Sequence, residues 1–487
     1  MAFGDSLLNG MRSYSIDDAR AASSIPALVG ASLADQPGLS GFRRATYPFP
    51  ILIDVEGQIA RFATIENGTA ALLQVLAGLR QIKADAARNA RDWLSRFEAG
   101  PRAGEPAAYD NLAIAGARIE DAFSLTYAQL DARIAAMAPT IRAGDDPLSW
   151  SGAWPAGDPY APGRWGFGDV HIALNSRHLR NPGNRDGLGP MTVLDVVGVR
   201  RPRALLVNMG ANHGLVEIVM RNRGRDGVRG LQAFADAWPP CARALAGLPG
   251  VEAVVMALLP LPSQVPCLAP PNPGPGPDLE PEPPRPDRYF DRYVSAIDPI
   301  STGSGYDGDA VAEFDRDVAA INAQVEASTR AAFSGSGKAL CFVSLAELLG
   351  RHDYKHRRGP VLPGGASGHN YSNYPLGRIS DVFRPTRLRG GICGLDQIHP
   401  TTIGYRYVAE EVRGTLMRMI DGLESRPIAV SDAGDPFLLS PNWPTIALMD
   451  ALYPRAAASI LGAEVLAISA ADRGEGDRLL FRPGWLR

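Results

Sequence analysis

The first ten residues, Met1-Ala-Phe-Gly-Asp-Ser-Leu-Leu-Asn-Gly10, decide how the rest of the chain is interpreted. A short apolar start is followed directly by Gly4-Asp5-Ser6-Leu7, a pattern expected where a strand turns into a helix. A serine hydroxyl at such a turn can be exposed for nucleophilic attack, and nearby backbone N–H groups are free to bind an oxyanion. The string is a weak signal alone, so later segments decide what it means.

Short, continuous apolar runs along the chain are typical of buried parallel strands. These runs are Met1–Phe3, Leu112–Ala115, Ala204–Met209, Ala253–Leu259 and Ala339–Val343. Helical patterns lie between or after them, at Ala70–Phe97, Ile119–Met137, Asp309–Ala332 and Tyr405–Ile420. Strands that alternate with helices predict a doubly wound α/β sheet.

The composition is that of an ordinary globular protein. The 487 residues are 45% hydrophobic and 21% charged, and the formal net charge is −3. This charge gives no reason to expect a nucleic-acid partner, and no apolar run approaches the roughly 18 residues of a membrane span. The cysteines lack the C-x-x-C spacing of a zinc knuckle, so we expect buried free thiols, with a disulfide left open. They are Cys241, Cys267, Cys341 and Cys393.

The start of the chain is short for a strand. Three residues precede Gly4, whereas a parallel strand normally needs about five. A start further upstream is one explanation of this short strand, and the location stays open: residues lost there would have room for an export signal. The chain as given has no visible signal peptide and predicts a cytoplasmic protein, whereas such a leader would make it secreted or periplasmic.

Long insertions separate the predicted elements, in keeping with 52 glycines and 41 prolines. We expect one domain over residues 1–425 with insertions near 40–105, 141–190 and 260–300, and a C-terminal extension over 426–487 packed on it. Residues 260–287 have the composition of a solvated, polyproline-like excursion, with a lid or partner motif as the alternative. The tryptophan-rich segment 141–190 is the better lid candidate, since aromatic residues on a mobile loop can cover an apolar substrate.

The segment from Gly394 to Tyr405 contains a candidate general base, His399. Asp396 lies three residues earlier, and one turn can let its carboxylate bond the far nitrogen of the imidazole ring. Such a bond fixes the tautomer and stabilises the imidazolium that forms when the base takes a proton. In isolation, a solvated aspartate and a histidine at a helix start are the favoured explanation, because short motifs often match by chance.

Two further segments follow predicted strands and offer oxyanion donors. Asn212 comes after the strand Ala204–Met209, at the sheet edge where open α/β sheets bind ligands, and its carboxamide can donate to an oxyanion. Gly116 follows Leu112–Ala115, and a glycine there lets its backbone N–H approach a ligand closely. Ordinary turn residues are the alternative at both places.

These four segments, in this order, resemble the SGNH hydrolases, the GDSL esterase/lipase superfamily. Gly4-Asp5-Ser6-Leu7 is similar to the first block of that family, Gly116 to the second, Gly210-Ala211-Asn212 to the third and Asp396-Gln397-Ile398-His399 to the fifth. The sequence departs from the third block, which usually reads Gly-x-Asn-Asp, because His213 stands in place of the aspartate. The insertions and the extension are outside the resemblance.

The resemblance implies a flavodoxin-like three-layer α/β/α sandwich, with a parallel sheet of about five strands, and a hydrolase without metal or cofactor. Ser6 would be the nucleophile, His399 the base and then the acid, and Asp396 the orienting carboxylate. The oxyanion hole would use the Ser6 and Gly116 backbone N–H groups and the Asn212 side chain. The expected partner is a lipid or other small-molecule ester. An acetylated carbohydrate and a non-catalytic binding protein are the alternatives, and the oligomeric state stays open.

Two other motifs suggest different chemistry, a zinc site and a phosphate-binding loop. His352 and His356 have the spacing of a zinc-binding pair, but basic neighbours and Gly359-Pro360 favour a solvated turn. Ser334-Gly335-Ser336-Gly337-Lys338 imitates the end of a P-loop but lacks its first glycine and its final Ser or Thr. We expect it to be the loop before the strand Ala339–Val343.

Overall fold

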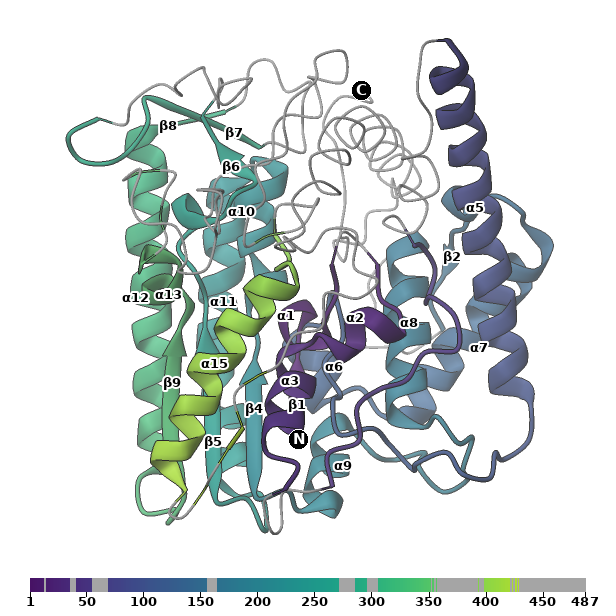
Figure 1. Ribbon diagram of the computed structural model, residues 1–487, viewed down its shortest axis with the longest axis horizontal. Coiled ribbons are helices and arrows are strands. Elements are labelled where there is room, and N and C mark those ends of the chain that lie inside the picture. Colours follow the sequence, from purple (N-terminus) through teal and green to yellow (C-terminus); the bar gives the residue numbers. More distant parts are fainter. Residues whose placement is uncertain are drawn as a thin grey trace.

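The structure is a computed structural model and describes residues 1–12, 15–35, 41–54, 69–155, 164–270, 285–295, 305–351 and 398–420, with residues 353, 356, 393, 423, 425, 426 and 428. Within these residues a parallel sheet is covered by helices on both faces, which gives a three-layer α/β/α architecture (Figure 1). The fold class expected from the sequence is therefore confirmed.

The sheet has four parallel strands in the spatial order β1-β4-β5-β9. They are β1 (Ala2–Gly4), β4 (Ala204–Asn208), β5 (Ala253–Leu258) and β9 (Ala339–Ser344). In the register, Gly4 lies beside Asn208, and Asn208 lies beside Ala257. The carboxyl ends of β1 and β4 thus meet at one edge of the sheet.

A fifth segment runs beside β1 without forming a full strand. The backbone N–H of Ala2 donates to the carbonyl of Asp110 at 2.7 Å, and the N–H of Leu112 donates to the carbonyl of Ala2 at 2.8 Å. Ile114 continues the ladder to the carbonyl of Gly4 at 2.9 Å. The predicted strand Leu112–Ala115 is therefore corrected to an extended segment with a single parallel bridge, between Ala2 and Asn111.

Helices and short hairpins make up the rest of the described chain. The helices are α1 (Ser6–Asn9), α2 (Asp18–Ala22), α3 (Ile25–Ser32), α5 (Thr69–Glu98), α6 (Ile119–Phe123), α7 (Tyr127–Ala143), α8 (Phe167–Arg180), α9 (Val193–Arg200), α10 (Leu215–Arg221), α11 (Gly224–Ala246), α12 (Gly308–Phe333), α13 (Leu345–Arg351) and α15 (Thr402–Met419). Single 3₁₀ turns are η1 (Pro147–Ser149), η2 (Ala211–His213) and η3 (Pro262–Gln264). Antiparallel pairs join β2 (Gly152–Ala153) with β3 (Arg164–Trp165), and β7 (Arg292–Ser295) with both β6 (Leu268–Ala269) and β8 (Tyr306–Asp307).

Alternate residues of the strands enter two separate cores. Leu205 and Val207 of β4 pack with the residues of α11 and α12, whereas Leu206 packs with those of α3 and α15. This alternation follows from the pleat, which points successive side chains to opposite faces of a sheet. Both faces are apolar, which explains why the strands read as continuous apolar runs.

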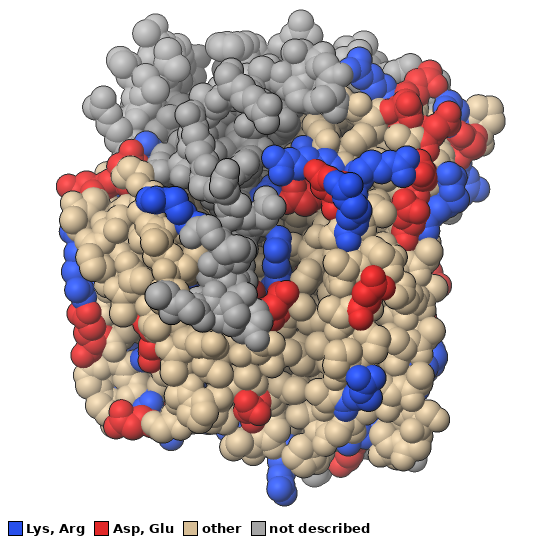
Figure 2. All heavy atoms as spheres, turned by 180° about the vertical axis from the view of Figure 1, so that it is seen from behind, with Lys and Arg blue, Asp and Glu red and all other residues tan. Residues whose placement is uncertain are grey.

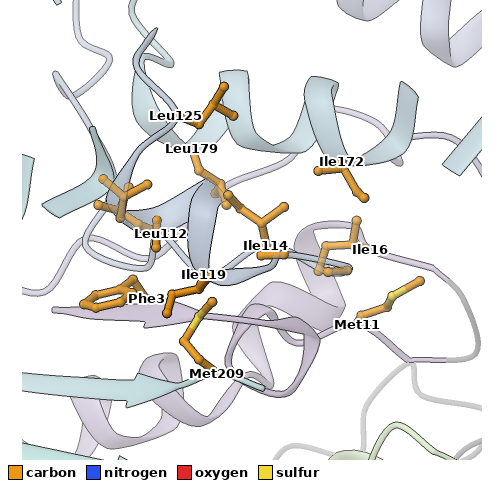
Figure 3. Packing of buried hydrophobic residues seen from close by; sticks show 14 of the residues in the cluster. Phe3, Met11, Ile16, Leu112, Ile114, Ile119, Leu125, Ile172, Leu179 and Met209 are labelled. Carbon is orange, nitrogen blue, oxygen red and sulfur yellow. The ribbon is translucent and has the colours of Figure 1, made fainter. Parts of the chain in front are cut away.

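Beyond β1, the first core extends toward α8. Figure 3 shows Phe3, Leu112, Ile114, Ile172 and Leu179 packed between the edge of the sheet and that helix. All fourteen residues of α8 are buried, and α7 and α5 pack outside it (Figure 1). The insertions near 40–105 and 141–190 thus supply much of the core.

The helical pattern Ile119–Met137 is corrected to two helices, α6 and α7. The hydroxyl of Thr126 accepts a hydrogen bond from the N–H of Gln129, and the side chain of Gln129 accepts one from the N–H of Thr126 at 2.8 Å. This capping box begins a new helix within the apolar pattern. The patterns at Ala70–Phe97, Asp309–Ala332 and Tyr405–Ile420 are confirmed as α5, α12 and α15, to within three residues at each end.

The lid interpretation of the tryptophan-rich segment is wrong for the residues described. Trp150 is 0% exposed and Trp165 1% exposed, and both belong to the first core. Trp154 packs against the guanidinium of Arg133, 5.0 Å from the ring centre. These indoles bury apolar area inside the domain instead of covering a site.

The other predicted segments are only partly described. Residues 271–284 and 429–487 lie outside the described residues, and so do the interpretations of the proline-rich segment and of most of the C-terminal extension. The extension begins on the domain: the N–H of Arg426 donates to the carbonyl of Ser32 at 2.9 Å, and Ile428 is buried. The glycine-rich imitation of a P-loop is confirmed as the turn between α12 and β9.

The described surface carries mixed charge. Figure 2 shows acidic and basic side chains next to one another on one face. Arg225 pairs with Glu313, and Arg285 pairs with both Asp287 and Asp309. Among the described helices, none combines the length and apolar character that a membrane crossing requires.

Candidate active site

The strand-to-helix turn at Ser6 is built by the residues on either side of it. Gly4 has φ +148°, and a Cβ there would collide with the carbonyl oxygen of Asn208, so only glycine fits. Asp5 caps α1 by accepting a hydrogen bond from the N–H of Leu7 at 3.2 Å. Ser6 is therefore the first residue of α1, at the carboxyl edge of the sheet, as predicted.

A cavity of about 90 Å³ opens at this edge, and Ser6, Asn212 and His399 all line it. The three residues come from α1, η2 and the segment before α15. Open α/β sheets bind ligands at the carboxyl ends of their strands. The structure therefore brings together three of the five predicted site residues around one space.

His399 reaches the cavity because α15 is attached to the end of α1. Thr401 caps α15 by accepting a hydrogen bond from the N–H of Gly404 at 3.2 Å. Two hydrogen bonds join the first turn of α15 to the residues that follow α1. Arg12 donates to the hydroxyl of Thr402 at 2.6 Å, and the hydroxyl of Tyr405 donates to the carbonyl of Met11. These bonds hold the start of α15, and His399 just before it, beside the turn that carries Ser6.

Cys393 forms a bridge with Pro400, next to His399, and the thiol of Cys393 donates to the carbonyl of Ile398 at 3.6 Å. Asp396, the predicted orienting carboxylate, lies outside the described residues. His399 itself is 4% exposed. A buried histidine at a cavity lined by a serine is an arrangement in which the imidazole can accept the serine proton.

Asn212 and Gly116 are neighbours. The carboxamide nitrogen of Asn212 donates to the carbonyl of Ala117 at 3.0 Å. This bond uses one of the two amide hydrogens, so the second can serve a ligand. Gly116 has φ +84°, and a Cβ there would lie 2.8 Å from the Cδ1 atom of Ile172. Gly116 is not among the described residues that line the cavity, whereas Asn212, which is bonded to the next residue, Ala117, does line it.

His213, which stands where the similar family usually has an aspartate, holds two segments of the site together. Its Nε2 atom accepts a hydrogen bond of 3.0 Å from the backbone N–H of Ile119, the first residue of α6. Its ring lies 5.0 Å from the ring of Phe234. The first N–H groups of a helix need acceptors from outside the helix. A neutral imidazole meets this need and ties η2, with Asn212, to the turn after Gly116.

Asp5 is the residue whose role the sequence reasoning missed. It is 1% exposed, and burial raises the pKa of its carboxyl group to about 7, although the positive charge that His399 can carry opposes the shift. A buried carboxyl group with a strongly raised pKa at a cavity is typical of functional sites. The Asp-Ser pair at the start of a helix is a common capping signal and could have predicted the cap, but the burial depends on tertiary packing.

The competing zinc pair has a structural role for its described member. His352 lies outside the described residues. The Nδ1 atom of His356 lies 2.8 Å from a carboxylate oxygen of Asp353, and its Nε2 atom lies 2.9 Å from the hydroxyl of Tyr293. Both ring nitrogens are thus engaged by protein groups. All four cysteines are free, and Cys341 is the half-buried one.

A larger cavity, of about 230 Å³, lies at the opposite edge of the sheet. Met1, Ala204 and Leu416 line it, and none of the predicted site residues does. It faces the amino ends of β1 and β4, where open α/β sheets do not usually bind ligands. The smaller cavity at Ser6 is therefore the candidate active site.

Comparison of the chain with models of known protein families, with curated proteins and with solved structures found no match.

Proposed function

We propose that the protein is a serine ester hydrolase of the SGNH type that acts on lipid or other acyl esters. The observation that carries the proposal is the meeting of Ser6, Asn212 and His399 at one cavity. These residues are far apart in the sequence, and each came from a segment that resembles a different block of that family. A chance convergence of a nucleophile, a base and an oxyanion donor is a less economical account.

The mechanism has two steps. In the first, the Oγ atom of Ser6 attacks the ester carbonyl while His399 takes its proton; the bond from the acyl carbon to the alkoxy oxygen breaks, and His399 gives the proton to the leaving alcohol. In the second, His399 takes a proton from water, whose oxygen attacks the acyl-enzyme. The acid leaves, and the proton returns to Ser6. The proposal gives Asp396 the role of holding the imidazole in the required tautomer.

The tetrahedral intermediates carry a negative oxygen that needs preorganised donors. The start of α1 offers the backbone N–H of Ser6, and Asn212 offers its second amide hydrogen. The turn at Gly116 acts in one of two ways: the Gly116 N–H donates to the oxyanion itself, or the carbonyl of Ala117 holds the Asn212 carboxamide where it can donate. Removing one such donor costs roughly 10²–10³-fold in kcat in serine hydrolases.

The apolar wall of the cavity favours an acyl ester over an acetylated carbohydrate. Outside the site residues, the lining comes mostly from aliphatic side chains such as Leu215, Leu259 and Leu345. Sugar hydroxyl groups would lose their hydrogen bonds to water against such a wall.

The test is hydrolysis of p-nitrophenyl butyrate by the Ser6→Ala variant, with Ser32→Ala as the matched control. Ser32 is also buried, and its hydroxyl donates to the carbonyl of Val29 at 2.8 Å, away from the cavity. We expect Ser6→Ala to abolish turnover with an unchanged circular dichroism spectrum, and Ser32→Ala to retain it. Undiminished turnover in Ser6→Ala would overturn the proposal.

A further inference from the structure

Two helices supply much of the aliphatic wall of the cavity. From α10 come Leu215, Val216, Val219 and Met220, and from α13 come Leu345 and Leu349. The four residues of α10 occupy positions i, i+1, i+4 and i+5, which lie along one side of a helix. One side of α10 therefore forms a continuous apolar surface beside the catalytic turn.

Charge is nearly absent from this cavity. Among the described lining residues, only Asp5, His399 and the free thiol of Cys393 are titratable, and Asp5 and His399 lie at the Ser6 end. Bringing an ionised group into such a space without a partner is costly. The cavity therefore suits an uncharged hydrocarbon group whose one reactive end lies at Ser6.

The volume limits the size of that group. An apolar protein cavity of about 150 Å³ accepts a molecule of the size of benzene, with its six carbons. By the same proportion, the volume of about 90 Å³ accommodates about four carbon atoms.

We propose that this cavity binds the acyl part of the substrate and that it selects a linear, uncharged acyl group of about four carbons. This inference rests on the proposed function and narrows its substrate class. The alcohol part then leaves through the open side of the cavity. Val216 lines the cavity and is half-buried, so its side chain can be enlarged or shortened with little cost to folding while the space beside Ser6 changes.

The experiment measures kcat/KM for the p-nitrophenyl esters of acetate, butyrate, octanoate and hemisuccinate. In the unmodified chain we expect butyrate to exceed acetate and octanoate by about tenfold or more, since each methylene in a fitted apolar pocket is worth about tenfold or more. Hemisuccinate, of butyrate length but with a terminal carboxylate, should be at least about tenfold poorer than butyrate.

Variants at one position then move the optimum in both directions. Val216→Phe should shift the preference from butyrate to acetate, and Val216→Ala should improve octanoate relative to butyrate. Val199→Phe is the matched control, because Val199 is 72% exposed on α9 and does not line the cavity. Its chain-length profile should equal that of the unmodified chain.

The outcomes separate this inference from the proposed function. One outcome overturns the acyl site alone: hydrolysis depends on Ser6, but the chain-length profile is the same in the unmodified chain, Val216→Phe and Val216→Ala. If Val216→Phe hydrolyses none of the esters, Val216→Ala decides. A shift of its preference toward octanoate supports the acyl site, and an unchanged chain-length profile overturns it. The absence of any hydrolysis that depends on Ser6 in the unmodified chain overturns the proposed function and the acyl site together.

Discussion

The guanidinium group of Arg12 donates a hydrogen bond of 2.6 Å to the hydroxyl group of Thr402, and both residues are buried. Arg12 follows the helix that starts with Ser6, and Thr402 is the first residue of the helix that follows His399. The bond thus joins the two halves of the candidate catalytic pair by a short path. Under the proposed mechanism, this bond helps to align the imidazole of His399 with Ser6.

Thr402→Val should therefore lower kcat/KM by about 10- to 100-fold, because about 1 Å of misplacement can cost 10²-fold in rate. The variant should also lose about 1–3 kcal/mol of unfolding free energy, since a buried donor loses an acceptor. Thr415→Val is the control: Thr415 is buried on the same helix and accepts a hydrogen bond of 3.0 Å from Arg418. Equal kinetics in the two variants would show that the tie does not position His399.

His213→Phe removes the acceptor of the Ile119 N–H and keeps an aromatic ring beside Phe234. We expect kcat to fall by about tenfold or more with little change in KM, because Asn212 then moves relative to the oxyanion. His213→Gln, which restores an acceptor, should recover most of the loss. Identical values of kcat in the two variants would contradict a positioning role for this hydrogen bond.

Gly4→Ala should prevent the strand-to-helix turn from forming, because the added Cβ meets the backbone of Asn208. We expect insoluble protein or a loss of more than about 4 kcal/mol in urea unfolding. Gly187 also has a positive φ, of +85°, but open space around it. Gly187→Ala isolates the conformational cost, about 1–2 kcal/mol, and a similar modest loss in Gly4→Ala would contradict the collision.

Asp5 predicts an unusual dependence of stability on pH. Its carboxyl pKa is about 7 in the folded chain against an ordinary value of 3.8, so between these values the folded state binds more protons than the unfolded state. Its contribution to stability is fully present below pH 4 and is lost as the pH rises to 7, by up to about 4 kcal/mol.

Asp5→Asn removes this dependence and keeps an oxygen that can cap α1. The measurement is urea unfolding of both proteins at several pH values from 4 to 8, where the unmodified chain should lose stability relative to the variant as the pH rises. Asp18→Asn is the control: burial works against ionisation of Asp18, but the Arg44 guanidinium lowers the pKa of this carboxyl below its ordinary value. Asp18 is therefore ionised in the folded and unfolded chains over most of this pH range, and the stability difference between Asp18→Asn and the unmodified chain should stay nearly constant. Parallel curves for Asp5→Asn and the unmodified chain would contradict the shift.

The local parts of the fold were predictable because their signals are local. The runs at β4, β5 and β9 are apolar on both faces of the sheet. Gly4 comes two residues before Ser6, and a glycine at the end of an apolar run indicates a sharp turn. The division between α6 and α7 was also readable, since Thr126 and Gln129 form a capping box. The apolar pattern, which continues across that division, concealed it.

The tertiary parts were not predictable in the same way. Nothing in the sequence pairs Arg12 with Thr402, and composition cannot tell whether a tryptophan in a glycine- and proline-rich segment covers a site or fills a core. Trp150 and Trp165 fill a core because the buried helix α8 lies beside them. The meeting of Ser6 and His399 at one cavity was expected only through a family resemblance, and Asp396 lies outside the described residues.

The most direct test of the central claim is labelling of the purified, full chain with a fluorophosphonate, followed by mass spectrometry of its peptides. Only a serine activated by a base and an oxyanion hole reacts readily with such a probe. We expect a single adduct on Ser6, which forms quickly in the unmodified chain and is absent from His399→Ala. No adduct, or an adduct on another serine at the same rate, would contradict it.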